Sequence, residues 1–213
     1  NIEGYYKDFT QLLALNRNKL ESADPNFVVE TGEAYGFDVS MKLEAKKFYI
    51  WGAYSLGFVN RFDGQQTYPP VFDRRHNLNL VTTYQMGKKK EWELGARWNF
   101  GSGFPFTLSQ GFYNSVPFSD GIGTDVLTGN TSDPGDLGIV YAGERNGGRL
   151  PYYHRLDLSV KYQIQLSKYG KAEITASATN AYNRANIFYF DRVRYTRVNQ
   201  LPILPSLSLT VQF

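Results

Sequence analysis

The sequence predicts an all-β fold in which about eight antiparallel strands form a meander in the wall of a transmembrane β-barrel. Apolar and polar side chains alternate through long segments, short connections alternate with long ones, and the last segment ends on Phe213. Successive side chains of a strand point to opposite faces, so each segment has one apolar and one polar face. This pattern favours a barrel wall, with lipid on one face and a wet lumen on the other.

The composition is compatible with a membrane barrel. The chain has 213 residues, of which 42% are hydrophobic and 16% aromatic, and its mean hydropathy is -0.42. No stretch approaches the roughly 20 consecutive apolar residues that a helical span needs, whereas the polar lumen of a barrel lowers the hydropathy. The net charge of +3 comes from Lys and Arg scattered among 20 acidic residues. A nucleic-acid partner is therefore not predicted.

Period-2 alternation marks each predicted strand in turn. The predicted strands, after a first segment at 2–7, are 35–44, 48–58, 77–86, 92–100, 155–163, 172–179 and 207–213. Their polar faces hold full charges, as a wet lumen allows. These charges are Asp38, Lys42, Arg97, Asp157 and Lys161.

The connections between these segments alternate in length. Those at 45–47, 87–90 and 167–170 are short. The others, roughly 11–30, 62–75, 109–152 and 183–202, are long. Outer-membrane barrels place short turns on the periplasmic side and long loops outside. We therefore expect extracellular long loops and a periplasmic carboxyl terminus.

Aromatic side chains fall at the short-turn ends of the predicted strands, where a barrel carries an interfacial girdle. The residues expected at this membrane interface are Tyr84, Trp92, Tyr162 and Phe213. They would anchor the strands at the boundary between lipid and the periplasm.

An internal repeat aligns residues 76–85 with 154–163 without gaps and places His76 and His154 at equivalent positions. A shared structural role is expected for these two histidines. Gly101-Ser102-Gly103 lacks the spacing of a nucleophile elbow, and the chain has no Cys. We expect no enzyme activity, no metal and no cofactor, and keep a small hydrolase using either histidine as the least favoured alternative.

Ligand contact is the more plausible role for polar residues near the long-loop ends of the strands. Lumen-facing Arg61, Asn77, Arg155 and Asp157 would meet a substrate first. Aromatic residues of the longest loop could stack on rings or sugars, or pack against the loop itself. These residues are Phe112, Tyr113 and Phe118. The alternating Asp and Gly residues of the same loop are compatible with a calcium site, but their spacing does not match the loop of an EF-hand.

Several segments, in this order, resemble the C-terminal barrel of TonB-dependent outer-membrane receptors, in particular receptors from Bacteroidetes-type bacteria. They are 32–39, 72–80, 92–98, 102–107, 180–186 and 201–206. The resemblance implies a barrel of about 22 strands around a plug domain. Residues 1–213 would be its C-terminal segment, without the plug and the N-terminal strands.

The resemblance also implies a function, a location and partners. The expected function is TonB-dependent nutrient uptake across the bacterial outer membrane. The expected partners are outer-membrane lipid, the rest of the barrel and plug, the TonB system acting through the plug, and a surface lipoprotein. Phe213 would serve as a signal for the insertion machinery. The alternative is a self-contained eight-stranded barrel with a structural or adhesive role, in which the first and last strands pair with each other.

Overall fold

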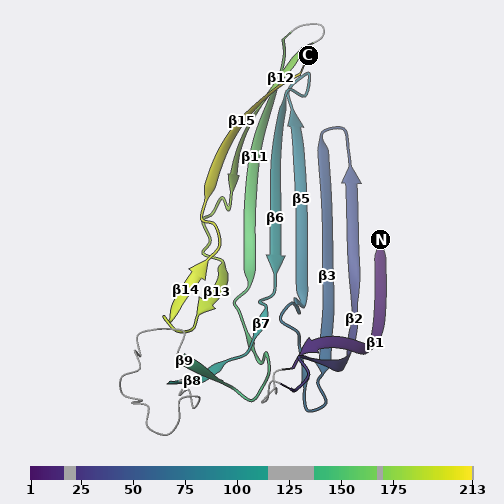
Figure 1. Cartoon of the computed structure of the whole chain (residues 1–213). Coiled ribbons are helices and arrows are strands. Elements are labelled where there is room, and N and C mark those ends of the chain that lie inside the picture. The colour runs from purple at the N-terminus through teal and green to yellow at the C-terminus, as the bar shows by residue number, and fades with distance from the viewer. Residues whose placement is uncertain (17–22, 115–136, 167–169, 213) are drawn as a thin grey trace.

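The computed structural model describes residues 1–16, 23–114, 137–166 and 170–212, and its long strands form one antiparallel sheet (Figure 1). Eight long strands follow one another across the sheet in the order of the sequence. They are β1 (Ile2–Leu15), β2 (Phe27–Glu44), β3 (Phe48–Phe62), β5 (His76–Met86), β6 (Trp92–Gly101), β11 (Tyr153–Gln165), β12 (Lys171–Thr179) and β15 (Leu204–Gln212). The predicted all-β meander is confirmed.

The long connections contain further strands that the sequence pattern does not show. β4 (Thr67–Tyr68) pairs with β3, and three two-stranded sheets form beyond the main one. These are β7 (Pro105–Phe106) with β10 (Gly148–Arg149), β8 (Ser109–Asn114) with β9 (Leu137–Tyr141), and β13 (Ile187–Asp191) with β14 (Thr196–Asn199). The predicted loop 11–30 is also too long, because residues 11–15 and 27–30 extend β1 and β2.

The register places the apolar side chains of neighbouring strands on one common face. Tyr35 lies opposite Phe58, and Tyr84 lies opposite both Phe48 and Leu94. The same face continues through Val160 to Ala176 and Leu207 at the far edge. Directly opposite residues share a face of the sheet. The predicted alternation therefore yields one continuous apolar surface and one polar surface.

The sheet has almost no hydrophobic core of its own. Among the described residues, the buried hydrophobic side chains are Ala14, Ala34, Tyr68 and Ala172. Large apolar side chains are exposed instead, for example Leu207 at 76% and Leu209 at 67%. A soluble protein rarely leaves such a large apolar surface in water. Such an exposed apolar face is typical of a surface that meets lipid or another protein.

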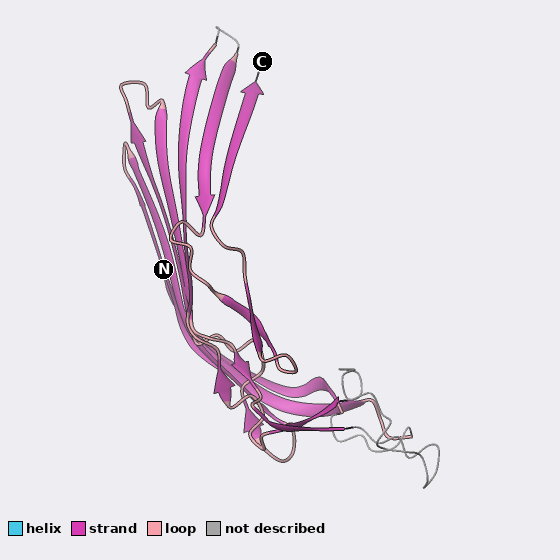
Figure 2. Ribbon diagram, turned by 90° about the vertical axis from the view of Figure 1, so that its left-hand side faces the viewer, coloured by secondary structure: helices cyan, strands magenta, loops and turns pink. Residues whose placement is uncertain are grey.

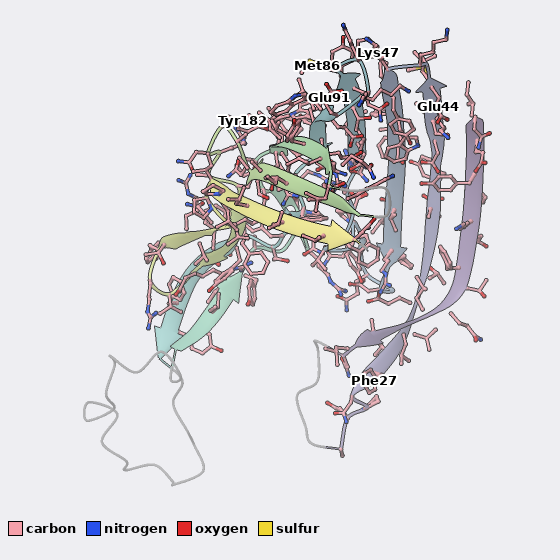
Figure 3. The ribbon with its side chains drawn as sticks, turned by 90° about the horizontal axis from the view of Figure 1, so that it is seen from above. Phe27, Glu44, Lys47, Met86, Glu91 and Tyr182 are labelled. Carbon is pink, nitrogen blue, oxygen red and sulfur yellow. The ribbon has the colours of Figure 1, made fainter. Side chains whose placement is uncertain are left out.

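The two ends of the sheet differ in the way the sequence predicts. The short turns lie at one end of the strands, and the long connections with their small sheets lie at the other (Figure 1). Figure 3 shows the sheet from above. In this view the short-turn residues Glu44, Lys47, Met86 and Glu91 lie on one side and Phe27 lies far from them. Among the described residues, no helix is long and apolar enough to cross a membrane.

The sheet is a curved, open band and not a closed barrel (Figure 2). β1 pairs with β2 and β15 pairs with β12, so β1 and β15 lie at opposite edges. The alternative of a self-contained eight-stranded barrel requires these two strands to pair with each other, and the described strands do not.

Candidate functional site

The polar face of the sheet carries the four charged or polar residues predicted to meet a substrate. Asn77 lies opposite Ser55 and Gly101, and Asp157 lies opposite Arg97. Arg61 and Arg155 belong to the same face, in β3 and β11. The structure brings Arg155 and Asp157 together, whereas Arg61 belongs to a separate cluster nearer the β1 edge.

Arg155 and Asp157 form an ion pair that also fixes the next connection. Arg155 Nη2 lies 2.9 Å from Asp157 Oδ2, and the other carboxylate oxygen accepts the backbone N–H of Asn180 at 3.0 Å. Asn180 is fully buried, and its side-chain amide donates to the carbonyl oxygens of Arg184 and Leu201. The pair therefore holds the start of the 180–203 connection against the polar face.

Arg61 contributes to a buried cluster that we call the ionic latch: Glu30, Arg61, Tyr68 and Arg145. Glu30 is 2% exposed and accepts hydrogen bonds from Tyr68 Oη at 2.5 Å and Arg145 Nη1 at 3.1 Å. Arg61 Nη1 lies 3.6 Å from the same carboxylate. The Arg145 guanidinium also lies 3.7 Å from the centroid of the Tyr68 ring. The latch joins β2, β3, β4 and the connection between β9 and β10.

The electrostatics of the latch follow from its burial. Burial, followed by the hydrogen bond to Glu30, raises the pKa of Tyr68 to about 12, although Arg145 opposes this shift. Burial alone would raise the pKa of the neighbouring Asp63, but the backbone N–H groups of Gln66 and Gln65, with Arg145, lower it. The Tyr68 hydroxyl is therefore a neutral donor to Glu30 at ordinary pH.

A second buried carboxylate, Asp73, ties the same two connections together. Arg149 forms an ion pair with the Asp73 carboxylate and donates to the carbonyl oxygens of Asp73 and Gly103 at 3.1 and 3.2 Å. A Cβ atom on Gly103 would lie 1.5 Å from the carbonyl oxygen of Leu150, so this close approach requires glycine. The long loops are consequently pinned to one another above the polar face.

Asn146 reinforces this arrangement from within the same connection. Its side chain donates to the Pro69 carbonyl oxygen at 2.8 Å and accepts from Thr107 Oγ1 at 3.1 Å. Glu30, Asp73, Arg145 and Arg149 do not stand out in the sequence, because their partners lie far away in the chain. The signal that the sequence does hold is a charged residue in or next to a long loop.

The two histidines have matching environments, as the internal repeat predicts. His76 Nδ1 lies 2.8 Å from Tyr54 Oη, and His154 Nδ1 lies 2.6 Å from Tyr182 Oη. Both backbones are also held by a residue that follows the next strand of the sheet. Ser102 binds the N–H and C=O groups of His76, and Asn186 binds those of His154.

These contacts place both imidazoles on the apolar face. Leu56 lies opposite His76, and Phe100 lies opposite His154. Each imidazole pairs through Nδ1 with a tyrosine hydroxyl, and each peptide group is held by a polar side chain, so the two histidines have their structural contacts in common. This geometry favours the structural role over the hydrolase alternative.

The predicted aromatic residues of the longest loop lie on the small sheet β8–β9. The Phe112 ring lies 5.9 Å from the Tyr195 ring in an edge-on arrangement, and Tyr113 is 56% exposed. Phe112 thus contacts the β13–β14 hairpin, which is 83 residues away in the chain. Phe118 lies outside the described residues, as does most of the segment considered for calcium.

The predicted interface residues gather in pairs at the short-turn ends of the strands. The Tyr84 ring lies 4.4 Å from the Phe48 ring, and the Trp92 ring lies 4.3 Å from the Tyr162 ring. All four side chains belong to the apolar face. Phe213 lies outside the described residues, so its place in this girdle stays a prediction.

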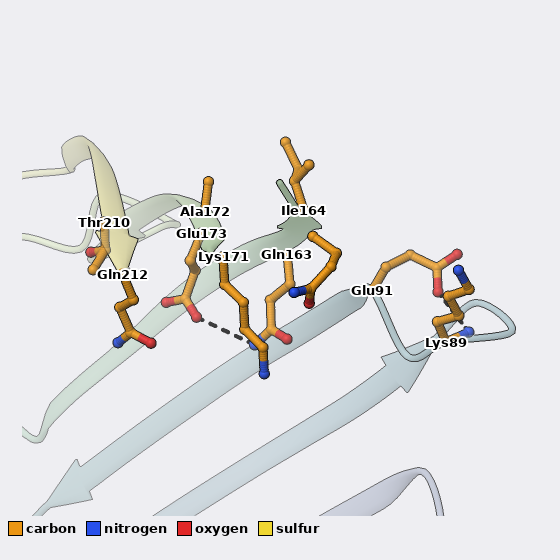
Figure 4. Close-up of a pocket in the computed structure, with 10 residues that line it drawn as sticks. Lys89, Glu91, Gln163, Ile164, Lys171, Ala172, Glu173, Thr210 and Gln212 are labelled. Atoms are coloured by element: carbon orange, nitrogen blue, oxygen red, sulfur yellow. Dashed lines mark hydrogen bonds between the residues drawn. The ribbon is translucent and has the colours of Figure 1, made fainter. Parts of the chain in front are cut away.

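A polar recess of about 380 Å³ lies on the polar face at the short-turn end, lined by residues that include Glu91, Gln163, Lys171 and Gln212 (Figure 4). Gln163 donates to Glu173 at 3.3 Å, and Lys161 Nζ lies 3.4 Å from Glu173 and 3.8 Å from Glu93. The recess can hold a polar or charged group. In the part of the chain that the structure describes, no group of three or more His, Asp or Glu side chains could hold a metal ion.

The chain is similar in structure to solved outer-membrane receptors. It superposes on the ferripyoverdine receptor of the outer membrane of Pseudomonas aeruginosa, bound to ferripyoverdine, with a TM-score of 0.58 at 10% identity. It superposes on a chain of the FpvAI–pyocin S2 complex with a TM-score of 0.56 at 12% identity. Each match covers 97% of this chain but 23% of the other, so the chain spans about a quarter of the length of the chains it matches.

At these identities the likeness establishes the fold: an antiparallel sheet of the kind found in part of a receptor barrel. No protein-family model matches the chain, and neither does any curated protein.

Proposed function

We propose that these residues form part of the wall and outer loops of a larger outer-membrane barrel that takes up an external nutrient with energy supplied through TonB. The observation that carries this proposal is the open, two-faced sheet. Its apolar face suits lipid, while each edge strand exposes a row of backbone donors and acceptors. Such an edge is not tolerated in lipid, so each edge needs a neighbouring strand.

The proposed neighbours are further strands of the same barrel, about 22 in all, around a plug domain. The likeness to about a quarter of each receptor chain supports this arrangement. The proposed partners are then outer-membrane lipid, the rest of the barrel and its plug, the TonB system acting through that plug, and a surface lipoprotein. The proposed location is the bacterial outer membrane, with the long loops outside and the carboxyl terminus in the periplasm.

In this proposal the polar face lines the path of the nutrient. Arg155, Asp157 and Asn77 lie near the long-loop end of that face and offer charge and hydrogen bonds to a polar ligand. Arg61 is partly engaged by Glu30, so its role is divided between the latch and the lumen. Siderophores, oligosaccharides and peptides all remain candidate nutrients.

Location and orientation can be tested in intact cells with a single cysteine, because residues 1–213 contain none; any Cys elsewhere in the complete protein would first be replaced by Ser. The complete native protein would carry Gln65→Cys in a long connection or Lys88→Cys in a short turn. We expect a membrane-impermeant maleimide to label Gln65→Cys in intact cells, and Lys88→Cys only after the outer membrane is permeabilised. Equal labelling of both, or the reverse order, would contradict the proposed orientation.

Uptake is tested in a strain that lacks the protein. The strain would be grown with iron chelates, oligosaccharides or peptides as the limiting nutrient, with and without the gene restored. We expect one class to require both the protein and an intact TonB system. Growth that is independent of the protein on all three classes, or of TonB on the class that requires it, would overturn the proposal.

A further inference from the structure

Two hairpins beyond the long-loop end of the sheet, β8–β9 and β13–β14, enclose a small aromatic recess. The recess has a volume of about 270 Å³, and its lining includes Phe106, Ser109, Phe112, Phe190, Arg192 and Tyr195. The Phe106 ring lies 6.0 Å from the Phe190 ring, and the Phe112 ring lies 5.9 Å from the Tyr195 ring. Four rings contributed by separate parts of the chain thus surround one space.

Arg192 gives this recess a positive wall. Its Nη1 donates to Ser109 Oγ at 3.1 Å, and its guanidinium lies 5.9 Å from the Phe106 ring and 5.1 Å from the Tyr141 ring. A guanidinium has five N–H donors in a fixed planar fork, so the bond to Ser109 leaves capacity for an anion. The contacts with Ser109 and the rings hold the fork in place before any ligand arrives.

The charge of the β13–β14 hairpin also favours an anion. Residues 187–199 contain three Arg and one Asp. The Asp191 carboxylate already accepts the backbone N–H groups of Val193 and Arg194 at 3.1 and 3.0 Å. One of its oxygens thus shapes the turn. Asp191 also lines the recess, so the positive balance belongs to the hairpin as a whole, and Arg192 is its cation in the recess lining.

Tyr195 is held in an unusual conformation beside the recess. Its φ angle is 53°, in the left-handed region that a bulky residue rarely adopts, and its side chain is 83% exposed. Neighbouring Phe188 and Tyr189 are exposed by 65% and 50%. Strained backbone and exposed aromatic clusters occur preferentially at binding sites.

We propose that this recess binds a planar aromatic ring that carries a carboxylate, with the ring between Phe112 and Phe106 and the carboxylate on Arg192. The volume is near the lower limit of ligand pockets, about 300 Å³, so it suits one ring of a larger molecule. This inference rests on the proposed uptake function and specifies the chemistry of a group that the nutrient presents to the outer loops.

Benzoate is the simplest probe of this chemistry. Its binding to the complete protein in detergent would be measured by saturation-transfer NMR titration, beside cyclohexanecarboxylate and benzyl alcohol. The first comparison ligand keeps the charge without the flat ring, and the second keeps the ring without the charge. We expect saturable binding of benzoate and weaker binding of both others.

Two substitutions test the two halves of the site. Arg192→Gln should weaken benzoate binding about tenfold, the scale of one charged hydrogen bond. Phe112→Ala should weaken it about as much, because it removes one of the two rings that pack on the ligand. Arg197→Gln removes the same charge from the same hairpin without lining the recess and should leave binding unchanged. Arg192→Lys keeps the positive charge but lacks the planar fork, and we expect it to bind benzoate with intermediate affinity. That result would show that Arg192→Gln acts through the lost contact and not through a disrupted hairpin.

Equal binding of cyclohexanecarboxylate, equal weakening by Arg197→Gln, or no saturation by benzoate would overturn the inference. The titration needs no energised membrane. If benzoate does not bind to a protein that still performs uptake, the inference about the recess is wrong and the proposed function stands. Conversely, loss of uptake dependence with benzoate binding intact overturns the proposed function alone.

Discussion

Arg145 Nη1 lies 3.1 Å from Glu30 Oε1, although 115 positions separate the two residues in the chain. Glu30 is on the polar face of β2, and Arg145 is in the connection between β9 and β10. A buried ion pair of this kind fixes the position of a long loop relative to the sheet. The latch therefore gives the outer loops a defined position over the polar face.

Breaking the latch should free the loops without unfolding the sheet. We predict that Arg145→Gln lowers the free energy of local opening of residues 62–75 by about 3 kcal/mol, because it leaves the buried Glu30 carboxylate with weaker compensation. Hydrogen exchange of the amides in this range measures the change. Lys42→Gln is the control, since Lys42 and Glu44 form an exposed pair and its loss should change exchange little. Equal effects of the two substitutions would show that the latch is not a stabilising contact.

The latch should also be sensitive to high pH through Tyr68. Its pKa is raised from 10.0 to about 12. A group with a raised pKa stabilises the fold fully below its unfolded value, and this contribution is lost as the pH rises through the folded value. We predict that the phenolate absorbance difference between the wild type and Tyr68→Phe has its midpoint near pH 12 when folded and near pH 10 when unfolded in denaturant. A folded midpoint near pH 10 would contradict burial of the hydroxyl against Glu30.

The two faces of the sheet can be distinguished on a single strand. Leu207 belongs to the apolar face and Ser208 to the polar face of β15. We predict that Leu207→Arg destabilises insertion into lipid by about 2–4 kcal/mol, the cost of Arg on the lipid side of a barrel near the bilayer centre. Ser208→Arg should cost far less, because water in the lumen solvates it. The measurement is the urea midpoint of refolding into lipid vesicles, and a larger cost at Ser208 would reverse the assigned faces.

Asp157 should matter more than its partner Arg155. One oxygen of Asp157 pairs with Arg155, and the other accepts the N–H of buried Asn180. We predict that Asp157→Ala costs about 2 kcal/mol, since it leaves that backbone donor without its acceptor, and that Arg155→Ala costs about half as much. Denaturant unfolding of each variant gives the comparison. If the two costs were equal, the contact with Asn180 would contribute nothing.

Alternation alone was enough to predict the long strands and their two faces. Tyr84, Trp92 and Tyr162 fall on the same face because a period of two residues leaves no other arrangement once the strands pair in register. The repeat likewise predicted the shared environment of His76 and His154. The alternation depends on neighbours along the chain, and the repeat depends on two copies of one segment, and the sequence displays both directly.

The loop architecture could not be predicted in the same way. The short strands β7 and β10 contain two residues each, too few to show a period. Asp73 and Arg149 are ordinary loop charges in the sequence. They pair only because the fold brings together two residues that are 76 positions apart. The aromatic recess is similar, because Phe112 and Tyr195 become neighbours only after both hairpins form.

The most direct test of the central claim is a disulfide scan of the two edge strands in the complete native protein. Cysteine pairs would join Gly4 or Tyr6 in β1 to Leu207 or Leu209 in β15, since residues 1–213 contain no Cys; any Cys elsewhere in the protein would be replaced by Ser. Ser177→Cys with Ser206→Cys is the positive control, because these residues lie opposite each other with their hydroxyl oxygens 2.6 Å apart. We expect the control pair to form a disulfide within the monomer on a non-reducing gel, and we expect no β1–β15 pair to do so. Efficient closure of any β1–β15 pair within the monomer would mean that the eight strands form a barrel of their own, and the proposed larger barrel would be wrong.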